Sequence, residues 1–210
     1  MTSVGSGNLT ASVRQRLLNI ARQQGEDYSL VLIRYAAERL LYRLTKSGDT
    51  SRFVLKGAML FNVWRGRLHR PTQDLDLLGY MDNSLGGIKD FFKKVCNVEV
   101  ENDGLVFDPE SVTAEEIRED QEYGGVRVHL KTMLGKAKIF LQIDIGFGDV
   151  ITPPAQEADY PALLGFSAPR IHIYPRETVV AEKTQAIVAL GINNSRMKDF
   201  FDLWIFQRDF

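Results

Sequence analysis

Apolar residues recur at helical spacing near the start of the chain and predict two amphipathic helices. The first is expected over residues 11–24, and its stripe consists of Val13, Leu17, Ile20 and Ala21. The second is expected over residues 29–44, and its stripe consists of Leu32, Tyr35, Ala36 and Leu40. The wetter side of this second helix carries Arg34, Glu38 and Arg43.

The middle of the chain changes to the alternating pattern that is typical of strands. A short strand at residues 53–55 is followed by Gly57, which permits a tight turn into a helix over residues 59–64. A further helix is predicted for residues 87–96, whereas residues 97–123 are polar and acidic and predict short strands at most. Beyond them, two alternating runs around Gly135 predict a hairpin with one strand near Val126–Leu130 and the other over residues 138–145.

Two helices, over residues 177–190 and 195–210, close the chain after a Thr-Pro-Pro loop at residue 152 and an irregular segment. The sheet-then-helices order predicts an α/β (α+β) fold, a mixed sheet flanked by helices, with no internal repeat. We expect a flexible lead-in over residues 1–8, a core with its N-terminal helices over residues 9–150, and a helical segment over residues 151–210 that completes the cleft.

Composition narrows the class of protein without naming a function. The 210 residues are 44% hydrophobic and 25% charged, which excludes disordered and fibrous chains. A net charge of -1 excludes capture of nucleic acid by the field of the whole molecule, but not by a local patch. A single cysteine, the lack of a signal peptide pattern and the lack of a long apolar run predict a cytoplasmic protein that does not enter the membrane.

The pair Asp74 and Asp76 is the strongest candidate for chemistry. Alternation places both carboxylates on one face of an extended segment, with Leu75 and Leu77 directed into the core. Two close carboxylates repel unless a cation neutralises them, and oxygen ligands suit Mg²⁺ or Mn²⁺. A lone Asp-x-Asp is more often a solvated strand end, but Asp144 adds a third acid in an apolar strand, where an unpaired charge is costly.

Charged residues also stand where the last two helices predict apolar ones. Lys183 lies within the core-facing stripe, where it either reaches out to solvent or points into a cleft as a phosphate-binding cation. On the last helix, Asp199 and Asp202 are either internal partners for Arg196 and Lys198 or members of the site.

These motifs together resemble the AbiEii/AbiGii toxin family of minimal nucleotidyltransferases, the toxins of type IV toxin–antitoxin systems. The stretch Lys56-Gly57-Ala58 resembles the family's glycine-rich first motif, and Asp74-Leu-Asp76 its metal-binding pair. Lys183 in Val-Val-Ala-Glu-Lys and the run from Arg196 through Asp199 to Asp202 resemble the third and last motifs. Asp144 resembles the third acid of the wider superfamily.

The resemblance implies a nucleotidyltransferase-like fold and transfer of a nucleoside monophosphate from an NTP to an acceptor hydroxyl, most plausibly on tRNA, with a cognate antitoxin as partner. It implies that Asp74, Asp76 and Asp144 bind Mg²⁺ or Mn²⁺, and that Asp144 alternatively acts as base. The implied nucleotide-binding and catalytic residues are Lys56, Gly57, Ala58, Arg70, Thr72, Lys183, Arg196, Asp199 and Asp202. Family members usually continue beyond the last motif, which implies a segment truncated at its C-terminus.

One position departs from the family pattern. Superfamily members usually carry a hydroxyl residue after the glycine, whereas this chain has Ala58, so only backbone N–H groups and Lys56 remain to cradle phosphate. The sequence leaves two alternatives open. The chain is either a non-catalytic nucleotide-binding or interaction module, or an enzyme whose acceptor is a protein or a small molecule.

Overall fold

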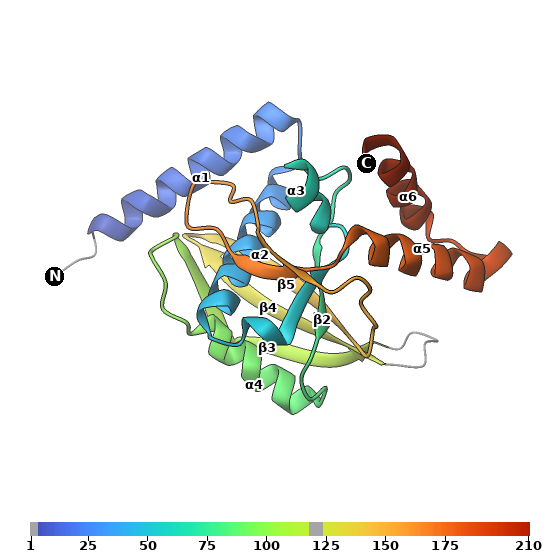
Figure 1. Cartoon of the computed structure of the whole chain (residues 1–210). Coiled ribbons are helices and arrows are strands. Elements are labelled where there is room, and N and C mark those ends of the chain that lie inside the picture. The colour runs from blue at the N-terminus through green and yellow to red at the C-terminus, as the bar shows by residue number, and fades with distance from the viewer. Residues whose placement is uncertain (1–3, 118–123) are drawn as a thin grey trace.

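One seven-stranded mixed sheet organises the molecule (Figure 1). The computed structural model describes residues 4–117 and 124–210. The strand order is β3-β4-β5-β2-β1-β7-β6. The strands are β1 (Phe53–Lys56), β2 (Asp74–Gly79), β3 (Leu105–Ile117), β4 (Gly125–Leu134), β5 (Ala137–Phe147), β6 (Gln156–Asp159) and β7 (Arg170–Ile173). The helices are α1 (Val4–Gln24), α2 (Tyr28–Lys46), α3 (Leu60–Arg65), α4 (Leu85–Cys96), α5 (Arg176–Leu190) and α6 (Met197–Asp209), with short 3-10 turns η1 (Thr50–Arg52) and η2 (Gly191–Asn193).

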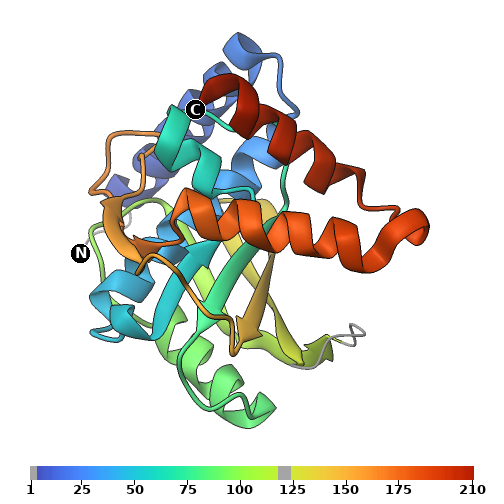
Figure 2. The ribbon, with the colours of Figure 1, turned by 45° about the vertical axis from the view of Figure 1, so that its right-hand side comes forward.

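The two faces of the sheet have different coverings. Helices α2 and α4 pack against one face, where the aliphatic side chains of β2, β4 and β5 are buried, and α1 packs on α2. The opposite face carries the polar side chains of the same strands because neighbouring residues of a strand point to opposite sides. Figure 2 shows α5 crossing the molecule beside the sheet, with α6 returning antiparallel to it. The polar face therefore lies next to the two C-terminal helices.

The predicted hairpin and helices are confirmed, with boundaries that shift by a few residues. Strands β4 and β5 pair antiparallel across the turn at Gly135, whose φ of 62° suits a glycine. Helix α1 begins at Val4 rather than near Ala11, so part of the expected lead-in is helical. In the described ranges no helix is both long and apolar enough to cross a membrane.

The prediction of short strands at most over residues 97–123 was wrong for the part that the structure describes, since β3 runs through thirteen residues. The remainder of that segment, residues 118–123, lies outside the described residues. Strand β3 is the edge of the sheet, so only one neighbour, β4, pairs with it, and polar side chains are tolerated there. An irregular register between Asp108 and Thr113, next to Pro109, interrupts the alternation that would have revealed the strand.

The strands β6 and β7 were also not predicted. Each has four residues, and β7 pairs parallel with β1 although more than a hundred residues separate the two strands. This pairing brings Tyr174, which directly follows β7, beside Lys56 at the end of β1; the Lys56 ammonium lies 5.2 Å from the ring centroid of Tyr174. It therefore closes one side of the site.

The prediction that one side of the second helix faces solvent was also wrong at two positions. Glu38 is 0% exposed and Arg43 is 6% exposed. Arg43 and Arg39 both bind the buried carboxylate of Asp103, with Arg43 Nη1 at 2.6 Å and Arg39 Nε at 3.0 Å from Oδ2. Glu38 accepts a hydrogen bond of 2.8 Å from the backbone N–H of Leu163. Long-range partners thus allow these charged side chains to be buried, although helical spacing alone assigns them to solvent.

Candidate active site

The acid pair lies on the polar face of β2, as alternation predicts. Leu75 and Leu77 are 2% and 0% exposed on the other face, so Asp74 and Asp76 share the open one. Strand β5 runs parallel beside β2 with Asp144 in register with Asp76. Residues in register on neighbouring strands project to the same side. The structure therefore brings all three sequence-predicted acids to one face of the sheet.

Asp76 and Asp144 belong to a row of charges that crosses four strands. The register pairs Arg127 of β4 with Asp144, Asp144 with Asp76, and Asp76 with Lys56 of β1. The sequence places these residues far apart, and only the strand order makes them neighbours. Two carboxylates thus lie in the middle of the row with one cation at each end.

The cations in the row do not balance the acid pair. Burial, followed by the charges of Asp144 and Asp74, raises the pKa of Asp76 to about 6, and Lys56 and Lys198 offset only part of this effect. Burial and the charge of Asp144 also raise the pKa of Asp74. Both carboxylates would be stabilised by an additional positive charge.

Gly57 is the point at which the backbone comes closest to this pair. Its φ is 72°, and a Cβ added there would lie 1.9 Å from Asp76 Oδ2. Only glycine fits both the conformation and the space. Ala58, by contrast, is 2% exposed, and α3 begins two residues later and is only six residues long. A phosphate role for Gly57 and Ala58 stays a prediction.

Asp144 differs from the pair because it already has partners. Arg127 donates from Nε and Nη2 to its two carboxylate oxygens, each at 2.8 Å, and Gln142 Nε2 donates at 3.2 Å. Among residues 4–117 and 124–210, no three His, Cys, Asp or Glu side chains are gathered as a set of metal ligands. The residues nevertheless fit a Mg²⁺ ion held by Asp74 and Asp76, since this ion commonly uses one or two carboxylates together with substrate phosphates.

Lys56 is held by acids that the sequence reasoning missed. Its ammonium lies 2.6 Å from Asp149 Oδ2 and 3.5 Å from Glu182 Oε2, and the Tyr174 hydroxyl donates to Asp149 at 2.9 Å. Burial alone would raise the pKa of Asp149, but Lys56 and Tyr174 hold it below its usual value. The only sequence signal for Glu182 was its position directly before Lys183, which is a weak indication that it lies near the site.

Lys183 ends up neither in solvent nor free in a cleft. Its side chain is 13% exposed, and its ammonium lies 2.8 Å from Asp199 Oδ1 and 2.7 Å from Asp202 Oδ2. The snorkelling alternative is therefore wrong. Arg196 also pairs with Asp199, with Nε 2.9 Å from Oδ2. These contacts join α5 to α6 through two buried carboxylates.

Asp202 additionally ties α6 to the loop that leads into the acid strand. Arg70 donates from Nε and Nη2 to its oxygens at 2.8 and 3.0 Å, and His69 Nε2 lies 2.5 Å from Oδ1. Burial alone would raise the pKa of Asp202, but His69, Arg70 and Lys183 hold it far below its ordinary value. His69 also packs on Phe61, at a centroid distance of 3.9 Å.

Thr72 belongs to this loop, which also lines a pocket. Thr72 makes only a long 3.4 Å hydrogen bond to the carbonyl of Asp74. The pocket encloses about 270 Å³ between the α1–α2 turn and residues 68–72, and Arg34, His69, Arg70 and Thr72 are among its lining residues. Asp74 and Asp76 do not line it. It therefore adjoins the candidate site without containing the acids.

Comparisons with known proteins identify the fold and the family of the chain. Two crystal structures share the fold: a "putative nucleotidyltransferase from H. pylori", with a TM-score of 0.53, and JHP933 from Helicobacter pylori, with a TM-score of 0.52. Each is 18% identical to this chain and matches 83% of it, while the chain spans 67% and 65% of their lengths. No curated protein sequence matches significantly. The model of the nucleotidyl transferase AbiEii toxin of type IV toxin–antitoxin systems matches residues 39–210, and the chain therefore belongs to this family of nucleotidyltransferases.

Proposed function

We propose that this protein transfers a nucleoside monophosphate from an NTP to an acceptor hydroxyl of RNA, with the end of a tRNA as the preferred acceptor. The acceptor oxygen attacks the α-phosphorus, the bond from that phosphorus to the bridging oxygen breaks, and pyrophosphate leaves. The hydroxyl proton passes to a base. Such a reaction depends on positioning and on neutralisation of charge rather than on a covalent intermediate.

The observation that carries this proposal is the unbalanced charge of Asp74 and Asp76. Burial and the charge of Asp144 raise the pKa of both carboxylates, and Asp74 raises that of Asp76 further, although Lys198 acts against the rise at both. A folded protein gains little stability from such an arrangement. A site that awaits a cation explains it.

Asp74 and Asp76 would hold Mg²⁺ or Mn²⁺, which when bound neutralises triphosphate charge and orients the nucleotide. Asp144 is in register with Asp76 and would serve as a further ligand or as the base for the acceptor hydroxyl. Either role requires Asp144 to exchange its present contact with Arg127. Arg127 thus keeps this carboxylate occupied until substrate arrives.

Lys183 would bind the triphosphate, and Asp199 would orient its ammonium. The 2.8 Å contact between these two residues supports the orienting role. Arg196 shares Asp199, and Asp202 holds both Lys183 and Arg70. We assign Asp202 to positioning, because its carboxylate is 0% exposed and has no surface for a nucleotide.

Lys56, Gly57, Ala58 and Thr72 would line the phosphates. Lys56 can bind phosphate only by loosening its contacts with Asp149 and Glu182. Gly57 leaves room beside Asp76 for a close approach of the nucleotide to the backbone. An NTP would also be expected to compete with Glu182, whose contact is the longer one.

The direct test is incubation of the chain with Mg²⁺, bulk tRNA and each α-labelled NTP in turn. Label should appear on tRNA with one or more NTPs and should be lost with Asp74→Asn, which preserves the shape of the side chain. Circular dichroism and thermal unfolding of the variant provide the control for folding. A folded wild-type chain that binds NTP but labels no RNA would contradict the RNA acceptor.

One observation favours a second candidate, a nucleotide-binding module without transfer. The cations Lys56, Lys183 and Arg127 are all engaged by carboxylates, and a non-catalytic module needs no rearrangement of them. Calorimetric titration with NTP in the presence of Mg²⁺ separates the alternatives. Binding without labelling of RNA, protein or small-molecule acceptors would favour the module, whereas labelling of a protein or small molecule would retain the enzyme and change its acceptor. A cognate antitoxin is the protein partner that we propose for either case.

A further inference from the structure

Helix α6 has its charged and aromatic residues on unusual sides. Asp199 and Asp202 face inward and are 1% and 0% exposed, whereas Phe200, Phe201 and Trp204 are 42%, 39% and 49% exposed. A helix of a globular protein normally buries its aromatic side chains and exposes its acids. Exposed aromatic residues gathered on one helix are typical of a binding surface.

Three of the exposed side chains form a stack. The rings of Phe201 and Trp204 lie 5.7 Å apart between centroids with an interplanar angle of 21°. The guanidinium carbon of Arg208 lies 4.5 Å from the centroid of Trp204. We call Phe201, Trp204 and Arg208 the aromatic stack. Aromatic rings together with a guanidinium group are the kind of surface on which unpaired bases stack.

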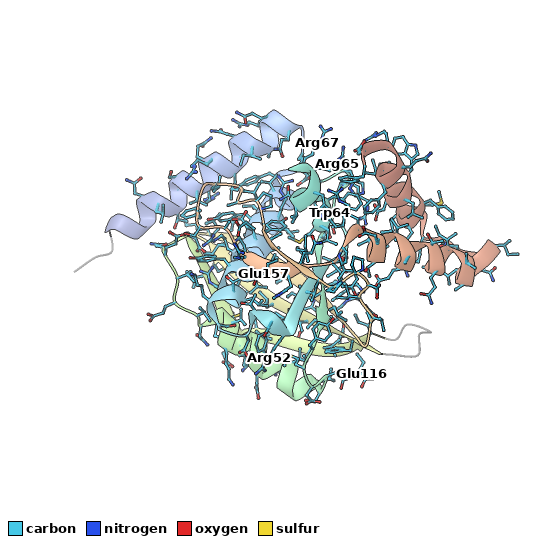
Figure 3. All side chains as sticks on the ribbon, viewed as in Figure 1. Arg52, Trp64, Arg65, Arg67, Glu116 and Glu157 are labelled. Atoms are coloured by element: carbon cyan, nitrogen blue, oxygen red, sulfur yellow. The ribbon has the colours of Figure 1, made fainter. Side chains whose placement is uncertain are left out.

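The buried acids hold this stack beside the candidate active site. Asp202 binds His69 and Arg70, and the ring of Phe201, the preceding residue, lies 5.5 Å from that of His69. Figure 3 shows Trp64 and Arg65 of α3 in the region that α6 packs against, where Trp64 contacts Phe206. Position and orientation of α6 are therefore fixed from its inner side.

Cations flank the stack and favour an anionic partner. Lys198, one helical turn before Phe201, is close enough to Asp74 and Asp76 to lower the pKa of both. In the described part of the chain Lys198 makes no ion pair of its own. Arg208 stands at the other end, although it also pairs with Asp209. One side of the helix thus carries a series of side chains that leads away from the acid pair, in the order Lys198, Phe201, Trp204 and Arg208.

We propose that this side of α6 binds the unpaired end of the RNA acceptor, with bases stacked on Phe201 and Trp204 and phosphates near Lys198 and Arg208. The inference rests on the proposed function, since it names the surface that presents the acceptor. A purely apolar protein partner would leave the two cations without a role. Single-stranded RNA uses both the rings and the charges.

The test is a titration with a single-stranded oligoadenylate of eight nucleotides, without NTP or divalent cation. In a Trp64→Phe background Trp204 is the sole tryptophan, and its fluorescence should be quenched as RNA binds. Phe201→Ala should weaken binding about tenfold, in line with the loss of one base–aromatic stack. Phe200→Ala is the matched control, because this ring is equally exposed but does not belong to the stack, and its effect should stay within about twofold.

Anisotropy of a labelled oligonucleotide with the unmodified chain and with Trp204→Ala covers the case in which Trp64→Phe fails to fold. The inference is overturned if RNA binds without quenching Trp204, if a duplex of equal length binds as tightly, or if Phe200→Ala weakens binding as much as Phe201→Ala. Concentration-dependent dimers that bury Trp204 would also overturn it. Retention of oligonucleotide binding by Asp74→Asn, with transfer lost, separates this surface from the chemistry of the acid pair.

Discussion

Two groups of carboxylates in this protein have opposite electrostatics. Asp103, 1% exposed, is clamped by Arg39 and Arg43, which outweigh its burial and hold its pKa below the usual value. At the acid pair, burial and neighbouring carboxylates dominate, and the pKa of Asp76 rises to about 6. Both groups join distant segments, but only in the first do neighbouring cations outweigh the effect of burial. The difference supports our proposal that the acid pair binds a ligand, whereas Asp103 stabilises the fold.

Neutralising one acid of the pair is the most direct test of this contrast. Asp76→Asn should lower nucleotide transfer by at least about 10³-fold, because the metal site loses a charged ligand. It should not lower the thermal midpoint at pH 7, since it removes a repulsive charge. Transfer assays and thermal unfolding of the same preparation check both parts. Loss of stability comparable with that of an Asp103 variant would show that the acid is structural.

Removal of the charge in the other group should have the reverse effect. Asp103→Ala leaves Arg39 and Arg43 without a carboxylate and should cost about 3–5 kcal/mol of unfolding free energy. Urea denaturation measures this loss. Asp108→Asn is the control, because its 2.8 Å pair with Lys131 is partly exposed and should contribute little to the free energy of unfolding. Similar losses for both variants would contradict the structural role of Asp103.

A matched pair of glycines tests how closely the backbone defines the acid pair. Gly57 and Gly48 have φ values of 72° and 83°, but an added Cβ meets Asp76 at Gly57 and nothing within 4 Å at Gly48. Both alanine variants carry backbone strain on the order of 1 kcal/mol. Gly57→Ala alone should also displace the Asp76 carboxylate and lower transfer about 10²-fold. Equal activity of the two variants would show that the Asp76 position is not critical.

The sequence predicts those parts of the fold and site that depend on local periodicity. The face shared by Asp74 and Asp76, the hairpin around Gly135 and the last two helices are confirmed by the structure. These features depend on alternation or helical spacing within a few residues. The joint placement of Asp144 and Asp76 needs strand order, which the resemblance to a known family implied and periodicity does not contain.

The parts that the sequence does not reveal depend on long-range pairing. Strand β7 pairs with β1 after a long crossover. Lys56 lies beside Asp149 and Glu182 only because of this pairing. The same holds for Asp103, whose arginines on α2 are some sixty residues earlier. Periodicity therefore predicts which side of an element a charged residue lies on, but it does not identify the partner of that residue.

The smallest expected effect is a difference in pH dependence between wild type and Asp76→Asn without divalent cation. Because the pKa of Asp76 in the folded state is about 6, above its ordinary value of 3.8, the folded state holds more protons than the unfolded state between these two pH values. The wild type should therefore lose on the order of 1–2 kcal/mol relative to the variant as pH rises from about 4 to 6. Thermal unfolding at intervals of half a pH unit measures this gap, and Mg²⁺ should narrow it above pH 6 by stabilising the ionised pair.

Asp103 contributes in the opposite direction, since its lowered pKa gives stability that is lost only as pH falls below about 4. A gap that stays constant with pH would mean that Asp76 is ionised throughout, and the contrast between the two carboxylate groups would then rest on geometry alone.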